Sequence, residues 1–253
     1  MKKIYSCIIF LKNLLLAVWA FLNTFLATLS VIAYLVIWDN DGKKRFPFGH
    51  LSQFWGRWVA FGLGLKMKVE GLENIDRKGG KYIFVANHES SIDVVALMKA
   101  LPLGLVTMTK HKMRKVPVLG YGLYKSGVIF VNREEALARQ GVVEQMVQQI
   151  NSTDLSLYIF PEGKRGDVAR KFKTGAIRIA IQTGVPIVPI ALIDTDKFWP
   201  LGNKITLDRS KKIKIIIGEP IPTDYLNGDV SDEDIIQELC DQAQAEIYKN
   251  ILK

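Results

Sequence analysis

The stretch Asn87–Asp93 holds the residues best suited to chemistry in this chain. His88 is one of only three histidines, and histidine is the side chain that ordinarily exchanges a proton near neutral pH. Residues 81–86 form a β-branched and aromatic run that predicts a buried strand, and the residues from Val94 onward predict a helix. His88 is therefore expected where a strand ends and a helix begins, which is a usual place for catalytic residues in α/β proteins.

The same residues also fit a purely structural interpretation. Ser90-x-x-Asp93 has the form of a capping box, with Ser90 as the N-cap and Asp93 as the third helical residue. In that interpretation Asp93 serves the helix and His88 is a loop residue. The two interpretations are compatible, because a cap would hold Asp93 in the first turn while a carboxylate oxygen faces His88. The helix N-terminus would favour the negative charge there.

Positive charge is concentrated in two regions of the chain. The net charge of +9 and the isoelectric point near 9.4 indicate an acidic partner, such as nucleic acid, an anionic membrane surface or a phosphorylated substrate. Residues 94–133 contain no Asp or Glu, and a second basic cluster spans residues 164–178. Arg133 and Arg165 each follow a strand-like run, so both are expected at the same sheet edge as His88. An arginine there can hold a phosphate through two parallel hydrogen bonds, whereas most of the lysines are expected to form a solvated face.

The N-terminal part of the chain is strongly apolar. Asn13–Trp38 is an uncharged run that is longer than the roughly 20 residues needed to cross a bilayer. It predicts an uncleaved anchor, because a cleaved signal peptide would have a shorter apolar core and a small-residue cleavage site. Basic residues flank this run on both sides, so the sequence does not decide its orientation in the membrane. A helical hairpin that enters only one leaflet is also compatible with it. Leu51–Leu65 suits either a membrane interface or a helix on the domain core.

Beyond residue 65 the chain alternates between strand-like and helix-like segments. This predicts a mixed, partly parallel sheet flanked by helices, in an α/β domain of residues 66–253 that follows an N-terminal membrane-anchoring segment of residues 1–65. The expected strands are Lys66–Glu70, Tyr82–Ala86, Val106–Thr109, Gly127–Val131, Ser156–Phe160, Val188–Leu192 and Lys212–Ile217. The expected helices are Ser91–Ala100, Leu119–Ser126, Glu134–Asn151, Thr174–Thr183 and Ser231–Leu252. Cys7, Cys240 and the scattered histidines give no disulfide framework and argue against a protein-held zinc site.

Four segments together resemble the motifs of the glycerolipid acyltransferase family, in the family's order and across about residues 65–220. The first is similar to its His-x4-Asp motif. The second departs slightly from the family, since Asn132 stands where Asp is common before the arginine. The four segments are Asn87-His88-x-Ser90-x-x-Asp93; Lys115-x-Pro117-x-x-Gly120 with Gly127-x-x-Phe130-Val131-Asn132-Arg133; Phe160-Pro161-Glu162-Gly163-x-Arg165; and Val185-Pro186-Ile187-Val188-Pro189.

The resemblance implies transfer of a fatty acyl group from a thioester, on coenzyme A or acyl carrier protein, to a lipid hydroxyl. In this family His88 would act as the general base and Asp93 would fix the imidazole and stabilise the imidazolium. Direct transfer needs no protein nucleophile, so Ser90 is expected to be a cap. Substrate-binding residues are expected at Arg133, Glu162, Gly163, Arg165 and Lys110, with the cations on the acceptor's phosphate and Glu162 orienting them or contacting the glycerol backbone. No cofactor is expected beyond the acyl donor.

The leading hypothesis is a 1-acylglycerol-3-phosphate acyltransferase that makes phosphatidate. Its expected partners are membrane lipids, the lysophospholipid acceptor and the acyl donor, with no nucleic acid. It is expected in a membrane, the inner one if the source is bacterial, with the active site at the cytoplasmic interface. One alternative is acylation of another lysophospholipid, such as one with an inositol or glycerol headgroup. A non-catalytic, membrane-anchored protein that binds anionic ligands through its basic face is the alternative from a different class.

Overall fold

A computed structural model describes residues 2–38, 49–117, 119–125, 128–131, 139–166, 171–202 and 207–252. The strands are β1 (Lys66–Glu70), β2 (Ile83–Ala86), β3 (Leu105–Val106), β4 (Met108–Lys110), β5 (Ile129–Val131), β6 (Ser156–Ile159), β7 (Ile187–Ile193) and β8 (Lys212–Ile217). The α-helices are α1 (Lys2–Trp38), α2 (Gly49–Leu63), α3 (Asp93–Ala100), α4 (Leu119–Lys125), α5 (Arg139–Asn151), α6 (Gly175–Thr183), α7 (Thr195–Phe198) and α8 (Glu233–Ile251). Short 3-10 helices occupy Leu72–Asn74, His111–Lys115 (η2) and Asp224–Leu226.

Six strands form one sheet in the order β1-β8-β7-β2-β6-β3. All neighbouring pairs are parallel except β7 and β8, which are antiparallel. The predicted mixed α/β fold with a partly parallel sheet is therefore confirmed. β1 and β8 have the predicted bounds, and β2, β6 and β7 lie within one residue of theirs at each end. These strands are easy to predict because each is a short β-branched or apolar run closed by turn residues.

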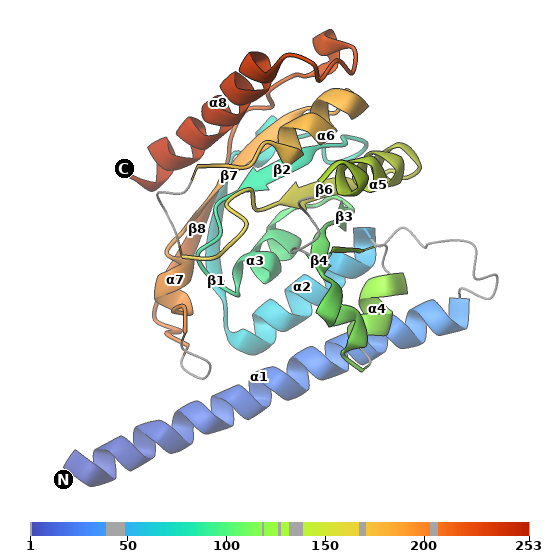
Figure 1. The fold of residues 1–253 in the computed structure, drawn as a ribbon. Helices are drawn as coiled ribbons and strands as arrows, with labels where there is room; N and C mark the ends of the chain where they lie inside the picture. The colour runs from blue at the N-terminus through green and yellow to red at the C-terminus, as the bar shows by residue number, and fades with distance from the viewer. Residues whose placement is uncertain are drawn as a thin grey trace.

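Helices cover both faces of this sheet (Figure 1), and the period-two alternation of the strands assigns each side chain to a face. In β2, Phe84 and Ala86 pack in a core with residues of α2 and α3, whereas Ile83 and Val85 pack in a second core with α5, α6 and α8. β2 is buried along its whole length. The residue that follows β2 is therefore fixed by packing on both sides.

One predicted strand is divided between two sheets. Val106–Thr109 was expected to be continuous, but β3 joins the main sheet while β4 pairs with β5 in a separate two-stranded parallel sheet. Thr107 lies at the division, where its Oγ1 donates to the Tyr158 carbonyl at 2.9 Å and its own carbonyl accepts from Ile129 N at 3.1 Å. The expectation that β5 ends at the edge of the same sheet as His88 is therefore wrong. Arg133, two residues beyond β5, lies outside the described residues.

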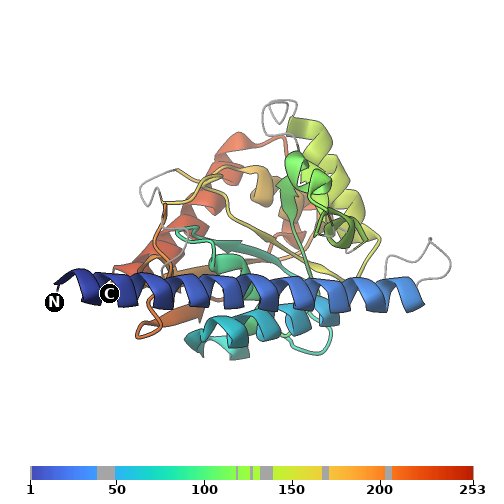
Figure 2. The same cartoon turned by 90° about the horizontal axis from the view of Figure 1, so that it is seen from below.

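α1 runs along the base of the molecule with α2 beside it (Figures 1 and 2). Within α1, Leu14–Tyr34 is long and apolar enough, by length and composition, to cross a membrane. Several of its large apolar side chains are exposed, among them Leu15, Phe21 and Leu26. α2 packs against both α1 and α3, and it also exposes Phe61. Both sequence interpretations of this helix therefore have support, because one face contacts the core and the other presents apolar side chains.

Polar side chains join α1 to α2. Asn23, only 6% exposed, accepts from Trp58 Nε1 at 2.9 Å and donates to the Trp58 carbonyl at 3.2 Å. Trp19 Nε1 donates to the Gly62 carbonyl at 2.8 Å, and Trp55 Nε1 donates to Thr28 Oγ1 at 3.2 Å. Directional hydrogen bonds of this kind fix how far α1 slides and rotates on α2. The predicted boundary after residue 65 stays a prediction, although Val59 and Ala27 belong to the same core as the sheet.

A glycine after β1 offers a test of the packing. Gly71 has a φ of 78°, and a Cβ there would lie 2.0 Å from the Ile217 carbonyl oxygen at the end of β8. We expect Gly71→Ala to lower the free energy of unfolding by about 2–4 kcal/mol, because it adds both backbone strain and a backbone clash. Gly141→Ala is the matched control in α5, where a Cβ meets nothing within 4 Å, and it should raise stability by up to about 1 kcal/mol. Urea unfolding in a mild detergent measures both; equal effects of the two variants would contradict the described turn.

Candidate active site

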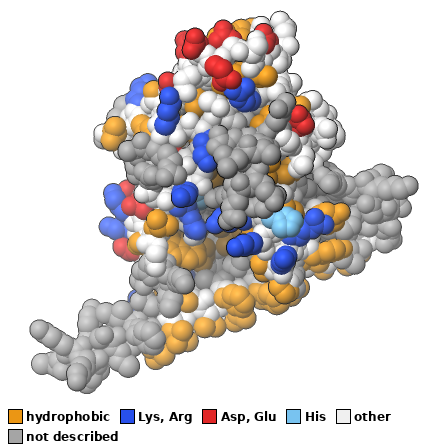
Figure 3. Space-filling model, viewed as in Figure 1, with side chains coloured by type: hydrophobic (Ala, Val, Ile, Leu, Met, Phe, Trp, Pro, Cys, Tyr) orange, Lys and Arg blue, Asp and Glu red, His pale blue; other side chains and the backbone are white. Residues whose placement is uncertain are grey.

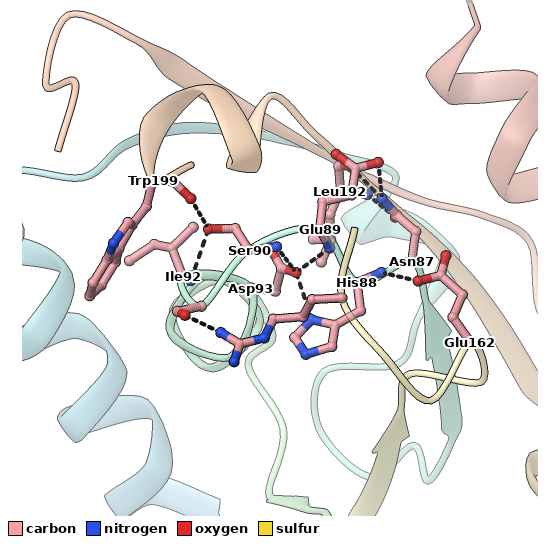
Figure 4. A network of polar contacts seen from close by, with 11 residues as sticks. Asn87, His88, Glu89, Ser90, Ile92, Asp93, Glu162, Leu192 and Trp199 are labelled. Carbon is pink, nitrogen blue, oxygen red and sulfur yellow. Dashed lines mark hydrogen bonds and ion pairs between the residues drawn. The ribbon is translucent and has the colours of Figure 1, made fainter. Parts of the chain in front are cut away.

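The site lies where two parallel strands end. β2 and β6 are neighbours in parallel register, so the segments that follow them, Asn87–Asp93 and Phe160–Gly166, meet at one edge of the sheet. Figure 4 shows His88 between Asp93 on one side and Glu162 on the other. The structure therefore brings His88, Asp93, Glu162, Gly163 and Arg165 to one place.

His88 and Asp93 form a hydrogen-bonded pair. His88 Nδ1 lies 2.8 Å from Asp93 Oδ2, and the Asp93 side chain is fully buried at the start of α3. The same Oδ2 accepts from Glu89 N and Ser90 N, each at 2.9 Å. In the tautomer in which Nδ1 donates to this carboxylate, Nε2 is the acceptor nitrogen of the imidazole. With 17% of the His88 side chain exposed, the geometry suits a general base.

The capping box is only half present. The Asp93 carboxylate accepts from Ser90 N as a capping box requires, but Asp93 is the first residue of α3 and Ile92 is its N-cap, with no side-chain cap. The prediction that Ser90 is the N-cap is therefore wrong. Its hydroxyl donates to the Trp199 carbonyl at 2.7 Å, which joins the His88 loop to the segment after α7. Ser90 is fully buried, so the structure gives it a positioning contact.

Glu162 supports the backbone of His88. Its Oε2 accepts from His88 N at 2.9 Å, its Oε1 accepts from the Tyr248 hydroxyl at 3.0 Å, and only 1% of the residue is exposed. Burial raises the pKa of Glu162 to about 7, and the two hydrogen bonds act in the opposite direction. Both carboxylate oxygens are thus engaged by protein donors. This arrangement favours a role in holding His88 over the predicted contact with substrate or cations.

The loop after β6 contacts His88 at two further points. The Phe160 ring stacks on the imidazole with centroids 4.0 Å apart, and Gly166 N donates to the His88 carbonyl at 3.0 Å. Gly163 has a φ of 75°, which favours glycine at the turn. Arg165 is exposed and donates to Ser91 Oγ. The arginine is thereby held beside the His88 loop with guanidinium donors available at the surface.

The remaining predicted cation on the described chain, Lys110, comes from the other sheet. It ends β4 in the two-stranded sheet, with an exposed side chain. It is followed by further exposed basic residues, including Lys112, Arg114 and Lys115. Figure 3 shows Lys and Arg side chains gathered across the middle of this face, above the hydrophobic side chains along the base. On this face, basic side chains thus border an apolar surface (Figure 3).

Sequence reasoning missed two supports of the site. Asn87 is fully buried, and its amide donates to the Leu192 carbonyl at 2.8 Å while its oxygen accepts from Leu192 N at 2.7 Å. It therefore pairs with β7 as a strand backbone would and fixes the turn before His88. Tyr248 is the second, from the far end of the chain. The Asn before His88 was visible in the sequence, but no local pattern indicates its partner, and none connects Tyr248 to Glu162.

A model of the acyltransferase family matches residues 66–193, which is half of the chain. The chain belongs to the acyltransferase family. Two relatives are 1-acyl-sn-glycerol-3-phosphate acyltransferases: a chloroplastic one from Arabidopsis thaliana, 26% identical over 90% of this chain and 61% of its own length, and the human beta form, 26% identical over 89% and 80%. The chain spans about three fifths of the length of the first curated relatives it matches.

A solved structure shares the fold. The crystal structure of the 1-acyl-sn-glycerophosphate acyltransferase PlsC from Thermotoga maritima superposes with a TM-score of 0.73 at 21% identity, covering 94% of this chain and 96% of that one. At this identity the likeness concerns the fold alone. It agrees with the mixed sheet and flanking helices derived above.

Glu89 gives a pH-dependent test of the site's electrostatics. Burial, followed by the charge of Asp196, raises its pKa to about 7. When folding raises the pKa of a carboxyl, the free energy of unfolding falls as the pH rises from the ordinary pKa of the group towards its raised pKa, here about 7. We therefore expect Glu89→Gln, which can still accept from Asn87, to raise the melting temperature at about pH 8, with the gain shrinking towards about pH 5. Thermal unfolding in detergent measures this, with exposed Glu238→Gln as the control; a gain that does not vary with pH would contradict the burial of Glu89.

Proposed function

We propose that this protein is a membrane-bound 1-acylglycerol-3-phosphate acyltransferase that moves a fatty acyl group from acyl-coenzyme A or acyl carrier protein to the sn-2 hydroxyl. The observation that carries the proposal is the His88–Asp93 pair at the edge of the sheet with Arg165 beside it. The relatives' names, the family match and the fold support the same reaction class. The product is phosphatidate.

The reaction proceeds by direct transfer. His88 Nε2 removes the proton from the acceptor hydroxyl as its oxygen attacks the thioester carbonyl, and the imidazolium is stabilised by the Asp93 carboxylate. Collapse of the tetrahedral intermediate breaks the carbon–sulfur bond, and the proton on Nε2 passes to the departing thiolate. The new ester and a free thiol balance the reaction. The Ser90 hydroxyl is already committed to the Trp199 carbonyl, which supports transfer without an acyl-enzyme.

The phosphate of the acceptor is held by arginine. Arg165 is fixed at the rim of the site by Ser91 while part of its guanidinium faces solvent. A guanidinium presents two parallel donors to two phosphate oxygens. Arg133 and Lys110 are proposed as further phosphate ligands, and Gly163 is proposed as a backbone contact of the headgroup at the turn.

The membrane segment serves a lipid acceptor and a lipid product. α1 presents exposed apolar side chains, α2 packs on α1, and α3, which begins with Asp93, packs on α2. The catalytic pair is therefore one helical layer away from the proposed membrane anchor. We propose that α1 holds the site at the cytoplasmic interface, so that the lysolipid enters from the bilayer and the acyl donor from water.

His88→Ala tests the base. We expect lysophosphatidate-dependent release of thiol from acyl-coenzyme A to fall by about 10²–10⁴-fold, which is the usual contribution of general base catalysis. His111→Ala, at an exposed position in η2, is the matched control and should keep the wild-type rate. Membrane fractionation and the melting temperature establish that both variants are folded. Near-normal turnover by a folded His88→Ala protein would exclude His88 as the base.

Arg165→Ala tests the phosphate site. We expect the KM for lysophosphatidate to rise by about 10–100-fold, as the loss of a hydrogen-bonded ion pair predicts, while the KM for the acyl donor stays within about twofold. Exposed Arg77→Ala controls for the loss of one positive charge. A panel of lysolipids with both donor types, read by mass spectrometry, identifies the acceptor and the carrier. An increase confined to the donor's KM would refute the assignment of Arg165 to phosphate.

A further inference from the structure

The C-terminal helix reaches the active site through one hydroxyl. Tyr248 lies near the end of α8, beyond residues 66–193 that match the family. Its hydroxyl donates to Glu162 Oε1 at 3.0 Å, and Glu162 Oε2 accepts from His88 N at 2.9 Å. A single carboxylate therefore connects α8 to the backbone of the proposed base. None of the residues assigned to the reaction above comes from this helix.

Tyr248 belongs to a stripe of α8 that holds the loop after β6 at both ends. Cys240, Gln244 and Tyr248 are spaced by four residues and share one face of the helix. Gln244 Oε1 accepts from Phe172 N at 3.1 Å, and Cys240 Sγ lies 3.7 Å from the Phe172 carbonyl oxygen. The Phe172 and Tyr248 rings pack with centroids 6.1 Å apart.

The same loop is closed at its base by a backbone hydrogen bond. Lys173 N donates to the Pro161 carbonyl at 3.1 Å, so the segment returning from the loop is tied to the residue before Glu162. α8 thus contacts both Glu162, which lies shortly after β6, and Phe172, which lies shortly before α6. Between them lies Arg165, whose guanidinium crosses to Ser91. Glu162 and Phe172 are therefore held by α8, and Glu162 in turn holds the backbone N–H of His88.

Glu162 needs its second donor. The carboxylate is 1% exposed, and a buried charge that loses a hydrogen bond is strongly disfavoured. Without the Tyr248 hydroxyl, Glu162 would take up a proton or turn towards solvent, and either change weakens its bond to His88 N. His88 would remain tied to Asp93 and Gly166, so the fold would persist. The imidazole would be less well placed, and small displacements of a reacting group are costly in rate.

We propose that Tyr248 is a positioning residue for acyl transfer: it holds Glu162 on the backbone N–H of His88 and so sets the place of the imidazole. This proposal rests on the function proposed above, because it takes His88 as the base. Tyr248 touches neither donor nor acceptor in this role. Its effect is therefore on the rate of the chemical step and not on the binding of substrates.

Tyr248→Phe removes the hydroxyl and keeps the ring against Phe172. We expect kcat to fall about tenfold, with both KM values within about twofold of wild type. The acid limb of the kcat–pH profile should move to higher pH, because the hydrogen bond from Tyr248 lowers the pKa of Glu162. The charges that face Glu162 are Glu89 and Asp93, and Lys173 lies beside Gly163; all are unchanged in the variant. Tyr225→Phe, at a 60% exposed tyrosine, is the control and should leave kcat and the profile unchanged.

A double-mutant cycle tests whether Tyr248 affects kcat through Glu162. If Tyr248 acts through Glu162, the double variant Glu162→Gln with Tyr248→Phe should lose no more activity than Glu162→Gln alone. Independent, multiplicative losses would overturn the proposal. So would a Tyr248→Phe protein whose kcat and pH profile match wild type.

A spectroscopic measurement separates this proposal from the proposed function. Histidine-selective ¹⁵N labelling gives three backbone amide signals, since the chain has three histidines, and His88→Ala identifies the one from His88. Tyr248→Phe should shift that signal upfield as its hydrogen bond to Glu162 weakens, and leave the other two in place. An unmoved His88 signal would overturn the positioning role even in an active enzyme. A shifted signal in a protein that transfers no acyl group would refute the proposed reaction alone.

Discussion

The parallel pairing of β2 with β6 is the constraint on which the site depends. It sets two loops from distant parts of the sequence at one sheet edge, and everything that holds His88 comes from those loops or leans on them. Asp93 fixes its ring from one side, and Phe160, Glu162 and Gly166 fix its ring and backbone from the other. A shift of one residue in this register would exchange the two faces of β2 and separate these contacts.

The ionisable groups that hold His88 are acidic, whereas the chain as a whole is basic. The protein carries a net charge of +9, yet the ionisable side chains hydrogen-bonded to His88 are the carboxyls of Asp93 and Glu162. Burial raises the pKa of Glu89 and of Glu162 to about 7, which limits the negative charge in the His88 loop and beside it. The exposed cations lie outside this group, where they meet solvent and anionic ligands. Acidic groups therefore hold His88, and the proposed role of the basic surface is to bind substrate.

The parts of this structure that sequence could predict are those governed by local patterns. β1 and β8 follow from their apolar alternation, and the loop position of His88 follows from the strand and helix on either side. The division at Thr107 could not be predicted, because it depends on a hydrogen bond to Tyr158 on another strand. The contact that the Ser90 hydroxyl makes with the Trp199 carbonyl could not be predicted for the same reason. Nor could the hydrogen bond from Tyr248 to Glu162, since nothing near Glu162 in the sequence indicates Tyr248.

The indole and amide hydrogen bonds between α1 and α2 have a consequence for a protein at a lipid bilayer. In water such bonds compete with solvent, but hydrocarbon offers no alternative partner to Asn23 or to the indole N–H groups. The hydrogen bonds between α1 and α2 would therefore be stronger in lipid than in water, and the two helices would move as one rigid unit. Because α2 also packs on α3, the tilt and depth of α1 in a bilayer would be passed on to the helix that begins with Asp93. The surrounding lipid would then determine how far the imidazole of His88 stands from the headgroups.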